Sequence, residues 1–179
     1  MNIKTFVRSA LALGAAAVTV TGYAASDTAT ATATVIVPIT ITKAVDLSFG
    51  KFAHGAGGTV TVSNSGARTA AGAILSAVGS SPTAARFNIV GDALATYSIA
   101  IAPDAAISNG GAGVTNNMAL AISSDFAGAN VTVGDVTAGG GTLSAGGLQS
   151  IFIGGTLTVN VGQVAGAYTG NIVVTVEYN

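Results

Sequence analysis

Histidine, cysteine and acidic side chains are the groups that could support catalysis or bind a metal in this 179-residue chain, and they are few. The chain has one histidine, His54, and no cysteine. His54 lies in KFAHGAGG, residues 51–58, whose glycines indicate a surface turn. There is no Gly-x-Ser-x-Gly elbow and no glycine-rich phosphate loop that leads into a helix. A triad built on His54 would need a serine and an aspartate brought together by the fold, which no motif indicates. We therefore expect no enzymatic activity and no cofactor.

The acidic residues do not form a metal-binding pattern. With one histidine and no cysteine, a zinc site is not expected. The aspartates stand singly along the chain and lack the spacing of an EF-hand. Asp104 and Asp125 are the pair that could contribute to an incidental calcium site in a loop. Because neither has a second ligand nearby in the sequence, the prediction is that the chain binds no metal.

Charge is sparse throughout the sequence. Only 7% of the residues are charged, with six lysines and arginines against seven acidic residues. No basic stripe is present, so neither nucleic acid nor an anionic membrane surface is an expected partner. A surface with so few charges favours a protein that packs against copies of itself, or alternatively one adapted to an unusual medium.

The first 24 residues have the organisation of a secretory signal peptide. Lys4 and Arg8 precede a small-residue apolar run, ALALGAAAVTV, at residues 10–20, and Gly22-Tyr23-Ala24 follows. The apolar run is too short to cross a membrane, and no stop-transfer segment comes after it. We expect cleavage after Ala24 or Ala25 and an exported mature chain without a membrane span, which passes through the periplasm to the cell surface or the medium.

The rest of the sequence predicts short strands, and these strands must position any functional site. Alternating apolar segments recur every 8 to 15 residues, separated by turns such as SNSG at 63–66 and SNGGAG at 108–113. Val, Ile and Thr are abundant, glycine numbers 25, and no stretch keeps a helical period. The pattern predicts an all-β sandwich or barrel formed by a single domain, residues 39–179. The expected strands are 29–37, 39–42, 45–49, 59–63, 73–78, 86–90, 96–102, 118–123, 130–133, 148–153, 156–161 and 168–178.

Residues 25–38 form an extension ahead of this domain. In TATATATVIVPIT, residues 28–40, one face of an extended strand carries small and branched apolar side chains and the other carries mainly threonine. Pro38 separates the extension from the next segment. An arm of this kind gains stability only when it pairs with a sheet edge and fills an apolar groove. The residues expected to face the groove are Ala29, Ala31, Ala33, Val35 and Val37.

The final strand has a matching pattern. NIVVTVEYN places four apolar side chains on one face, the last of them the penultimate residue, and Gly166 is fourteenth counted back from Asn179. With these features the chain resembles pilin subunits of chaperone–usher fimbriae, in which such a strand is recognised by a periplasmic chaperone. The residues that carry this motif are Gly166, Ile172, Val174, Val176 and Tyr178.

Two longer pieces extend the resemblance. ATVIVPITITKAVDLSFGKFAHGAGGTVTVSNSGART near the start and AGAYTGNIVVTVEYN at the end are similar to a family of secreted bacterial β proteins that is catalogued as a domain of unknown function and considered fimbrial-like. The chain departs from the best-known pilins because it has no disulfide. Its donor residues are also mostly alanine, so a shallow groove is expected.

The resemblance implies an immunoglobulin-like, pilin-like sandwich that lacks its last strand. A chaperone fills the groove temporarily, and an outer-membrane usher exchanges it for the N-terminal arm of the next subunit, which is donor-strand complementation. Because this contact is head-to-tail, it makes a filament that supports adhesion or biofilm formation. A single domain whose aromatic residues are spread over the strands as core anchors favours a repeating shaft subunit over a tip adhesin. The alternative is that 29–37 pairs within its own domain, giving a self-complete secreted sandwich that serves as a surface or matrix protein.

Overall fold

The structure, a computed structural model, describes residues 22–125, 131–133 and 139–179, the middle segment by its backbone only. Residues 1–21, most of the predicted signal peptide, lie outside the described residues, as does Asn130 of the predicted strand 130–133. The chain divides into two units, Met1–Thr34 and Val35–Asn179. In the first unit, residues 22–34 are exposed and belong to no strand.

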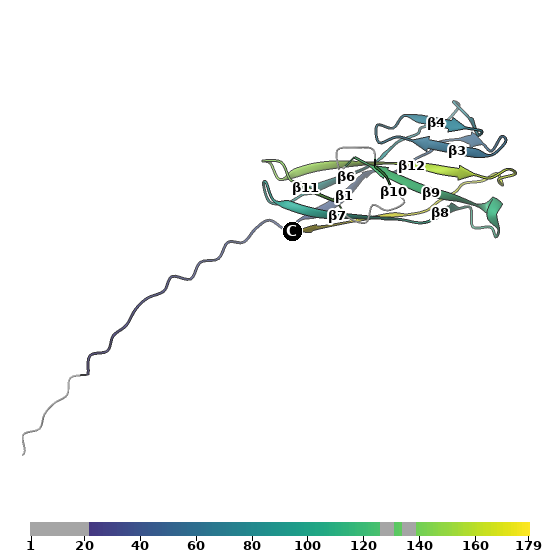
Figure 1. Cartoon of the computed structure of the whole chain (residues 1–179). Coiled ribbons are helices and arrows are strands. Elements are labelled where there is room, and N and C mark those ends of the chain that lie inside the picture. The colour runs from purple at the N-terminus through teal and green to yellow at the C-terminus, as the bar shows by residue number, and fades with distance from the viewer. Residues whose placement is uncertain (1–21, 126–130, 134–138) are drawn as a thin grey trace, which may run out of the picture. The chain divides into compact units, whose positions relative to one another are not determined.

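The second unit is an all-β domain (Figure 1). Its only helical element among the described residues is the 3-10 turn η1 (Val114–Asn116). The strands are β1 (Thr40–Val45), β2 (Phe52–Ala53), β3 (Gly58–Val62), β4 (Arg68–Ala71), β5 (Ile74–Leu75), β6 (Ala85–Val90), β7 (Thr96–Pro103), β8 (Ala106–Ser108), β9 (Asn117–Ser124), β10 (Val131–Val133), β11 (Gly139–Thr142), β12 (Leu148–Val159) and β13 (Ile172–Tyr178).

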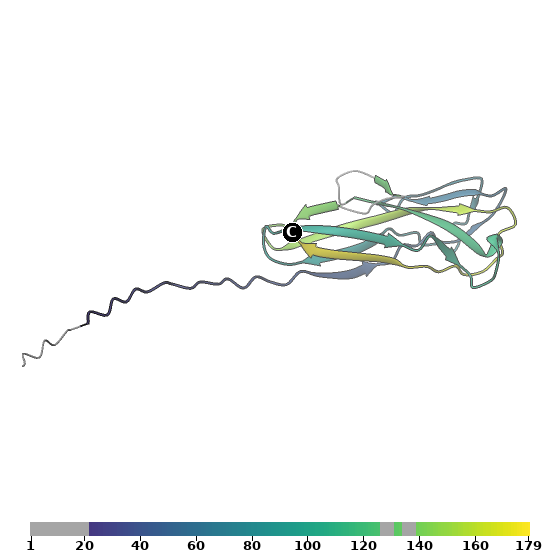
Figure 2. The ribbon, with the colours of Figure 1, turned by 60° about the horizontal axis from the view of Figure 1, so that its bottom comes forward.

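The named strands pair antiparallel in three sheets. The largest contains β1, β6, β12, β3 and β4 in that order, with β8, β9 and β10 attached through β12. A second sheet has the order β11-β7-β13, and β2 pairs with β5. Figure 2 shows β13 and β7 running side by side. Strand β12 organises the large sheet, because its first half pairs with β6 and its second half with both β3 and β9.

One hydrophobic core joins the two larger sheets. Every second residue of β6, β7, β9 and β12 is buried, as period-two strands require when one face meets a core. The core includes Ile89 of β6, Tyr97 and Ile99 of β7, Ile122 of β9 and Ile153 of β12. The prediction of an all-β fold is confirmed.

Several strand boundaries differ from the prediction. The two predicted strands 148–153 and 156–161 form one strand, β12, which runs through Gly154 and Gly155. A Cβ on Gly154 would collide with the Val62 carbonyl oxygen, so these glycines allow close backbone approach and do not mark a turn. The sequence also missed β2, β4, β8 and β11. Strand β11 overlaps the glycine-rich segment TAGGG, residues 137–141, from which the sequence alone predicts a turn. Residues 29–37 belong to no strand, and of the predicted strand 45–49 only Val45 lies in one, as the last residue of β1.

The buried Tyr97 makes the stability of the domain depend on pH in the alkaline range. Its side chain is fully buried, and its hydroxyl has no hydrogen-bond partner among the described residues. Burial, and secondarily the negative charge of Asp125, raise the pKa of Tyr97 above the ordinary tyrosine value. Because the folded state favours the neutral phenol, Tyr97 contributes to the stability of the domain. This contribution is complete below about pH 10, and it is lost as the pH rises through the higher folded-state pKa.

We therefore expect the free energy of unfolding to fall above about pH 10 more steeply in the native chain than in Tyr97→Phe. Denaturant unfolding of both proteins at a series of alkaline pH values measures this difference. If the free energy of unfolding fell equally with pH in both proteins, Tyr97 would not be the cause of the pH dependence.

Candidate functional site: an open strand edge beside an apolar groove

Strand β13 has a neighbour on one side only. It pairs with β7, from Ile172 opposite Pro103 to Tyr178 opposite Tyr97. At the ends of this ladder the Asp104 amide donates to the Asn171 carbonyl at 2.8 Å, and the Asn179 amide donates to the Thr96 carbonyl at 3.2 Å. Antiparallel ladders alternate, so the odd-numbered residues of β13 bond to β7 and the even-numbered residues direct their amides and carbonyls to the other edge. No described strand pairs with that edge.

The inward face of β13 is incompletely covered. Ile172, Val174, Val176 and Tyr178 pack against the core but are only half-buried. In contrast, the inward residues of the adjacent strand β7, Tyr97, Ile99 and Ile101, are at most 6% exposed. The difference follows from the missing neighbour, because a side chain at a free edge lacks the cover of a flanking strand.

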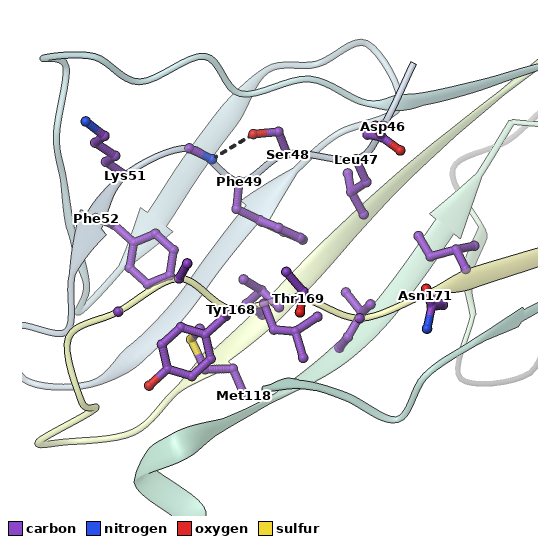
Figure 3. Close-up of a pocket in the computed structure, with 18 of the residues that line it drawn as sticks. Asp46, Leu47, Ser48, Phe49, Lys51, Phe52, Met118, Tyr168, Thr169 and Asn171 are labelled. Atoms are coloured by element: carbon purple, nitrogen blue, oxygen red, sulfur yellow. Dashed lines mark hydrogen bonds between the residues drawn. The ribbon is translucent and has the colours of Figure 1, made fainter. Parts of the chain in front are cut away.

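A groove of about 1130 Å³ lies along this side of the domain. One wall is the segment that follows β1, with Leu47, Phe49 and Phe52, and the other is the segment 163–173 that leads into β13. Figure 3 shows Phe49 and Phe52 on one side and Tyr168 and Thr169 on the other, with Met118 beside Tyr168. Buried side chains of the large sheet form the floor, so the groove opens directly onto the core; they are Phe87, Met118, Leu120 and Leu157.

Arg68 fixes the first wall. Its guanidinium donates to the carbonyl oxygens of Phe49 at 2.9 Å, Lys51 at 3.1 Å and Ser76 at 2.8 Å, and to the Ser80 hydroxyl at 2.7 Å. No salt bridge neutralises Arg68 among the described residues. This set of charged hydrogen bonds holds two irregular segments together, which the two-residue ladder between β2 and β5 alone would fix poorly.

Arg68→Met is therefore expected to lower the free energy of unfolding by about 3 kcal/mol, because the partly buried carbonyls of Phe49 and Ser76 lose their charged donor. Lys51→Met is the matched control, since it removes a positive charge from the same wall at an exposed side chain. Its expected effect is below about 0.5 kcal/mol. Equal effects of the two substitutions would show that net charge, and not the hydrogen bonds of Arg68, stabilises the wall.

Tyr168 and Gln163 fix the second wall. The Tyr168 hydroxyl lies 2.7 Å from the Val164 carbonyl oxygen and 3.0 Å from that of Thr115, to which it can donate, and it accepts from the Gln163 side-chain amide at 3.0 Å. Gln163 is buried and also donates to the Thr115 carbonyl at 2.8 Å. Gly170 is required further along, because a Cβ there would lie 2.8 Å from a methyl group of Ile107.

The Tyr178 hydroxyl ties the start of the domain to its end. It accepts from the Asp92 amide at 2.6 Å and donates to the Val37 carbonyl oxygen at 2.6 Å. Gly91 makes room for it, since a Cβ at that position would collide with the hydroxyl. Val37 is therefore held by its own domain through the backbone, although its side chain remains 52% exposed.

The structure brings some of the sequence-predicted residues together. Ile172, Val174, Val176 and Tyr178 share the inward face of β13. Gly166 lies outside that strand, on the rim of the groove, and a Cβ there would make only ordinary contacts with Asn109. The predicted donor residues Ala29, Ala31, Ala33, Val35 and Val37 are exposed and belong to no strand, and the carbonyl of Val37 bonds to the Tyr178 hydroxyl of its own domain. The groove walls at Phe49, Phe52 and Arg68 were not identified from the sequence, because they lie in irregular segments with no periodic pattern.

The residues considered for chemistry are separate and already bonded. His54 is exposed and its Nδ1 bonds to the carbonyl of Gly55. Asp104 accepts from the Asn171 amide at 2.7 Å, and Asp125 accepts from the Phe152 amide at 2.7 Å. No group of three or more His, Cys, Asp or Glu side chains that could hold a metal occurs in the part of the chain that the structure describes.

The fold and the groove define an all-β domain with an uncovered strand edge. Residues 39–178 match the family described as a domain of unknown function, DUF4402, and the chain belongs to that family. A comparison with curated proteins found no match. Within the described residues, no helix has the length and apolar character needed to cross a membrane.

Proposed function

We propose that this chain is an exported structural subunit of a surface fimbria that assembles by donor-strand complementation. Each copy has an immunoglobulin-like sandwich that lacks one strand, and residues 25–36 of another copy supply it. A periplasmic chaperone covers the groove during transit, and an outer-membrane usher replaces the chaperone with the arm. The resulting filament serves adhesion or biofilm formation at the cell surface.

The observation that carries the proposal is the free edge of β13. Its even-numbered residues present backbone groups outward and half-buried side chains inward, beside a groove that opens onto the core. A strand added there would bond to the edge and cover the groove at the same time. The arm has the required form, since it alternates small apolar and threonine side chains and is exposed throughout.

The local sequence at the domain boundary favours an arm from another copy. To reach the groove of its own domain, the arm would have to reverse direction within Val35–Ile39. This segment, VIVPI, contains no Gly, Asn or Asp to adopt a tight turn, and Val37 is restricted to extended conformations because it precedes Pro38. Tyr178 also fixes the Val37 carbonyl. The reversal therefore lacks suitable residues and would break an existing contact.

Tyr168 supports the immunoglobulin-like assignment. It precedes the strand β13, and its hydroxyl bonds to the carbonyl of Val164, four residues upstream. A tyrosine near the start of a late strand that bonds back to the backbone a few residues earlier is the tyrosine corner of such sandwiches. The corner here also shapes the groove wall, because it holds the segment 163–168.

The arm can supply enough free energy to pair with the groove. Burying three alanine methyls and one valine contributes about 5 kcal/mol, at about 0.8 kcal/mol for each methylene-sized group. Hydrogen bonds to the β13 edge add about 1 kcal/mol each. The even-numbered residues from 172 to 178 offer both a donor and an acceptor, so the backbone contribution is comparable to that of the side chains.

The test compares the mature chain with a version that lacks residues 26–36. Surface-extracted material is run on a denaturing gel with and without heating. We expect a ladder that collapses on heating for the mature chain and none for the truncated chain. A synthetic peptide of residues 25–36 added to the truncated chain should raise its melting temperature, whereas a peptide with the same composition in scrambled order should not.

A mature chain that runs as a monomer without heating, together with a truncated chain that fails to fold, would overturn the proposal. The arm would then belong to its own sandwich, and the chain would be a self-complete surface or matrix protein.

A further inference from the structure

Six of the exposed apolar side chains of the domain lie in two clusters at its ends, and three others, Ile74, Val78 and Val173, lie outside them. The first, called the exit cap, consists of Val90, Leu94 and Leu148, which are 40%, 66% and 55% exposed. The second, called the groove cap, consists of Val114, Val161 and Val164, which are 75%, 71% and 42% exposed. In Figure 1 the η1 turn of the groove cap and the end marked C lie at opposite ends of the domain.

The exit cap surrounds the point where the arm leaves the domain. Val90 pairs with Leu148 across β6 and β12, and the Leu94 amide donates to the Ser144 carbonyl. The next turn carries Asp92, whose amide bonds to the Tyr178 hydroxyl that holds Val37. Val37, at which the arm joins the domain, and the three apolar side chains therefore belong to the same end.

Leu94 is also strained. Its φ is 60°, the left-handed region, and no other non-glycine residue among those described has a positive φ. A glycine or asparagine would relieve this strain. A leucine that is both strained and exposed contributes little to the stability of the isolated domain, which points to a role in a contact.

The groove cap borders the open end of the groove. Val164, which lines the groove, donates its amide to the Thr115 carbonyl, next to Val114. The Asn160 side chain bonds to the Val114 carbonyl at 3.0 Å and so ties the two loops together. The loops are uncharged, since the sequence has no Asp, Glu, Lys or Arg between Asp104 and Asp125 or between Asp135 and Glu177. Depletion of charge around exposed apolar side chains is typical of the centre of an interface.

The shape of the groove indicates which way an arm would run. The groove lies beside residues 163–173, and residues 174–178 of β13 do not line it. The arm is bulkiest at Val35 and Ile36 and smallest at its alanines. The sizes match when Val35 lies near residue 172 and the alanines near residue 178, which is an antiparallel pairing with β13, the more stable of the two orientations.

We propose that the exit cap of one copy docks on the groove cap of the next. This inference rests on the proposed function. In an antiparallel arrangement the arm emerges from the groove beside Val164 and continues, through Val37 and Pro38, directly into the exit cap of its own domain. The two apolar surfaces are then brought together. The contact is between different surfaces, so it repeats along a filament.

The opposite direction of insertion makes a different prediction. An arm parallel to β13 would emerge near Tyr178, so two exit caps would face each other. Each arm could then enter the groove of its partner, and the assembly would close as a symmetric pair. The two arrangements therefore differ in which side chains meet.

Engineered cysteines distinguish them, because the native chain has no cysteine. Nine double variants combine Val90→Cys, Leu94→Cys or Leu148→Cys with Val114→Cys, Val161→Cys or Val164→Cys in the mature chain. The control pair is Ala121→Cys with Thr175→Cys, two exposed residues in the middle of β9 and β13. Filaments are oxidised, heated and run on gels without and with a reducing agent. We expect at least one double variant to give a heat-stable, reducible ladder about tenfold stronger than the control.

The results of this experiment distinguish failure of the cap contact from failure of the proposed function. A heat-labile ladder in all variants without disulfide ladders in any would overturn the cap contact and leave the proposed function intact. Reducible dimers from Leu94→Cys alone would also overturn it, in favour of the symmetric pair. Loss of the heat-labile ladder from the native chain itself would refute the proposed function, and the cap contact with it.

Leu94→Asn provides a second, independent readout. Relief of the backbone strain is expected to raise the melting temperature of the truncated domain, while loss of the apolar contact lowers the temperature at which the ladder dissociates. If Leu94 had only a structural role, Leu94→Asn would shift the melting temperature of the domain and the dissociation temperature of the ladder in the same direction. That result would contradict the proposal.

Discussion

Ala33→Asp is expected to abolish the heat-labile ladder while the domain itself remains folded. In the proposed assembly the Ala33 side chain faces the apolar groove, so the substitution would bury a carboxylate without a partner. The cost of such burial is several kcal/mol, and each 1.4 kcal/mol is a tenfold loss of affinity, so a loss of more than about 100-fold is expected. Titrating the truncated chain with arm peptides that carry each substitution measures this loss directly.

Thr32→Asp is the matched control. It introduces the same charge one residue away, on the face of the arm that points away from the groove, and it should change affinity by less than about threefold. If Thr32→Asp were the damaging substitution, the arm would be inserted with threonines inward, which is a one-residue slip. If neither substitution had an effect, the arm would not be the strand that fills the groove.

The second large effect is expected in the hydrogen exchange of β13. In the isolated domain the amides of Val173, Thr175 and Glu177 bond to β7, and those of the even-numbered residues face the open edge. We expect the even-numbered amides to exchange about 100-fold faster than their odd-numbered neighbours. Residue-resolved exchange measured by NMR on residues 37–179 reports this alternation.

Addition of the arm peptide should then slow the even-numbered amides selectively. The odd-numbered amides act as an internal control, because their partners on β7 do not change. Slow exchange at all positions before the peptide is added would mean that the edge is already covered within one chain, and the donor-strand proposal would be wrong.

Much of the fold was predictable because the strands carry a period-two pattern that burial imposes. The alternation in β7 and β9 identifies the inward residues Tyr97, Ile99 and Ile122 without knowledge of their partners. The short strands β4 and β8 and the glycine-rich β11 could not be predicted in this way. Their residues form strands because a neighbouring strand supplies hydrogen-bond partners. Whether such a strand lies alongside depends on contacts between residues that are distant in the sequence.

The candidate site was only half predictable. The pattern of Ile172, Val174 and Val176 predicts an amphipathic strand, and its inward face was assigned correctly. The pattern cannot indicate whether a second strand covers the edge of β13, since a central and an edge strand of this kind have the same alternation. The groove walls were missed for a similar reason, because Phe49, Phe52 and Arg68 meet through side-chain to backbone hydrogen bonds that leave no periodic signal.

The amino-acid sequence by itself determined that the chain is an all-β domain with scarce charge, an alternating arm and an amphipathic last strand. These properties follow from local side-chain periodicity and composition, which are present in the chain before it folds. Only the tertiary structure decided that β13 keeps a free edge, that a groove lies beside it, and that the Tyr178 hydroxyl holds the Val37 carbonyl. Each of these depends on which segments meet in space, and segments meet according to long-range packing that no local pattern encodes.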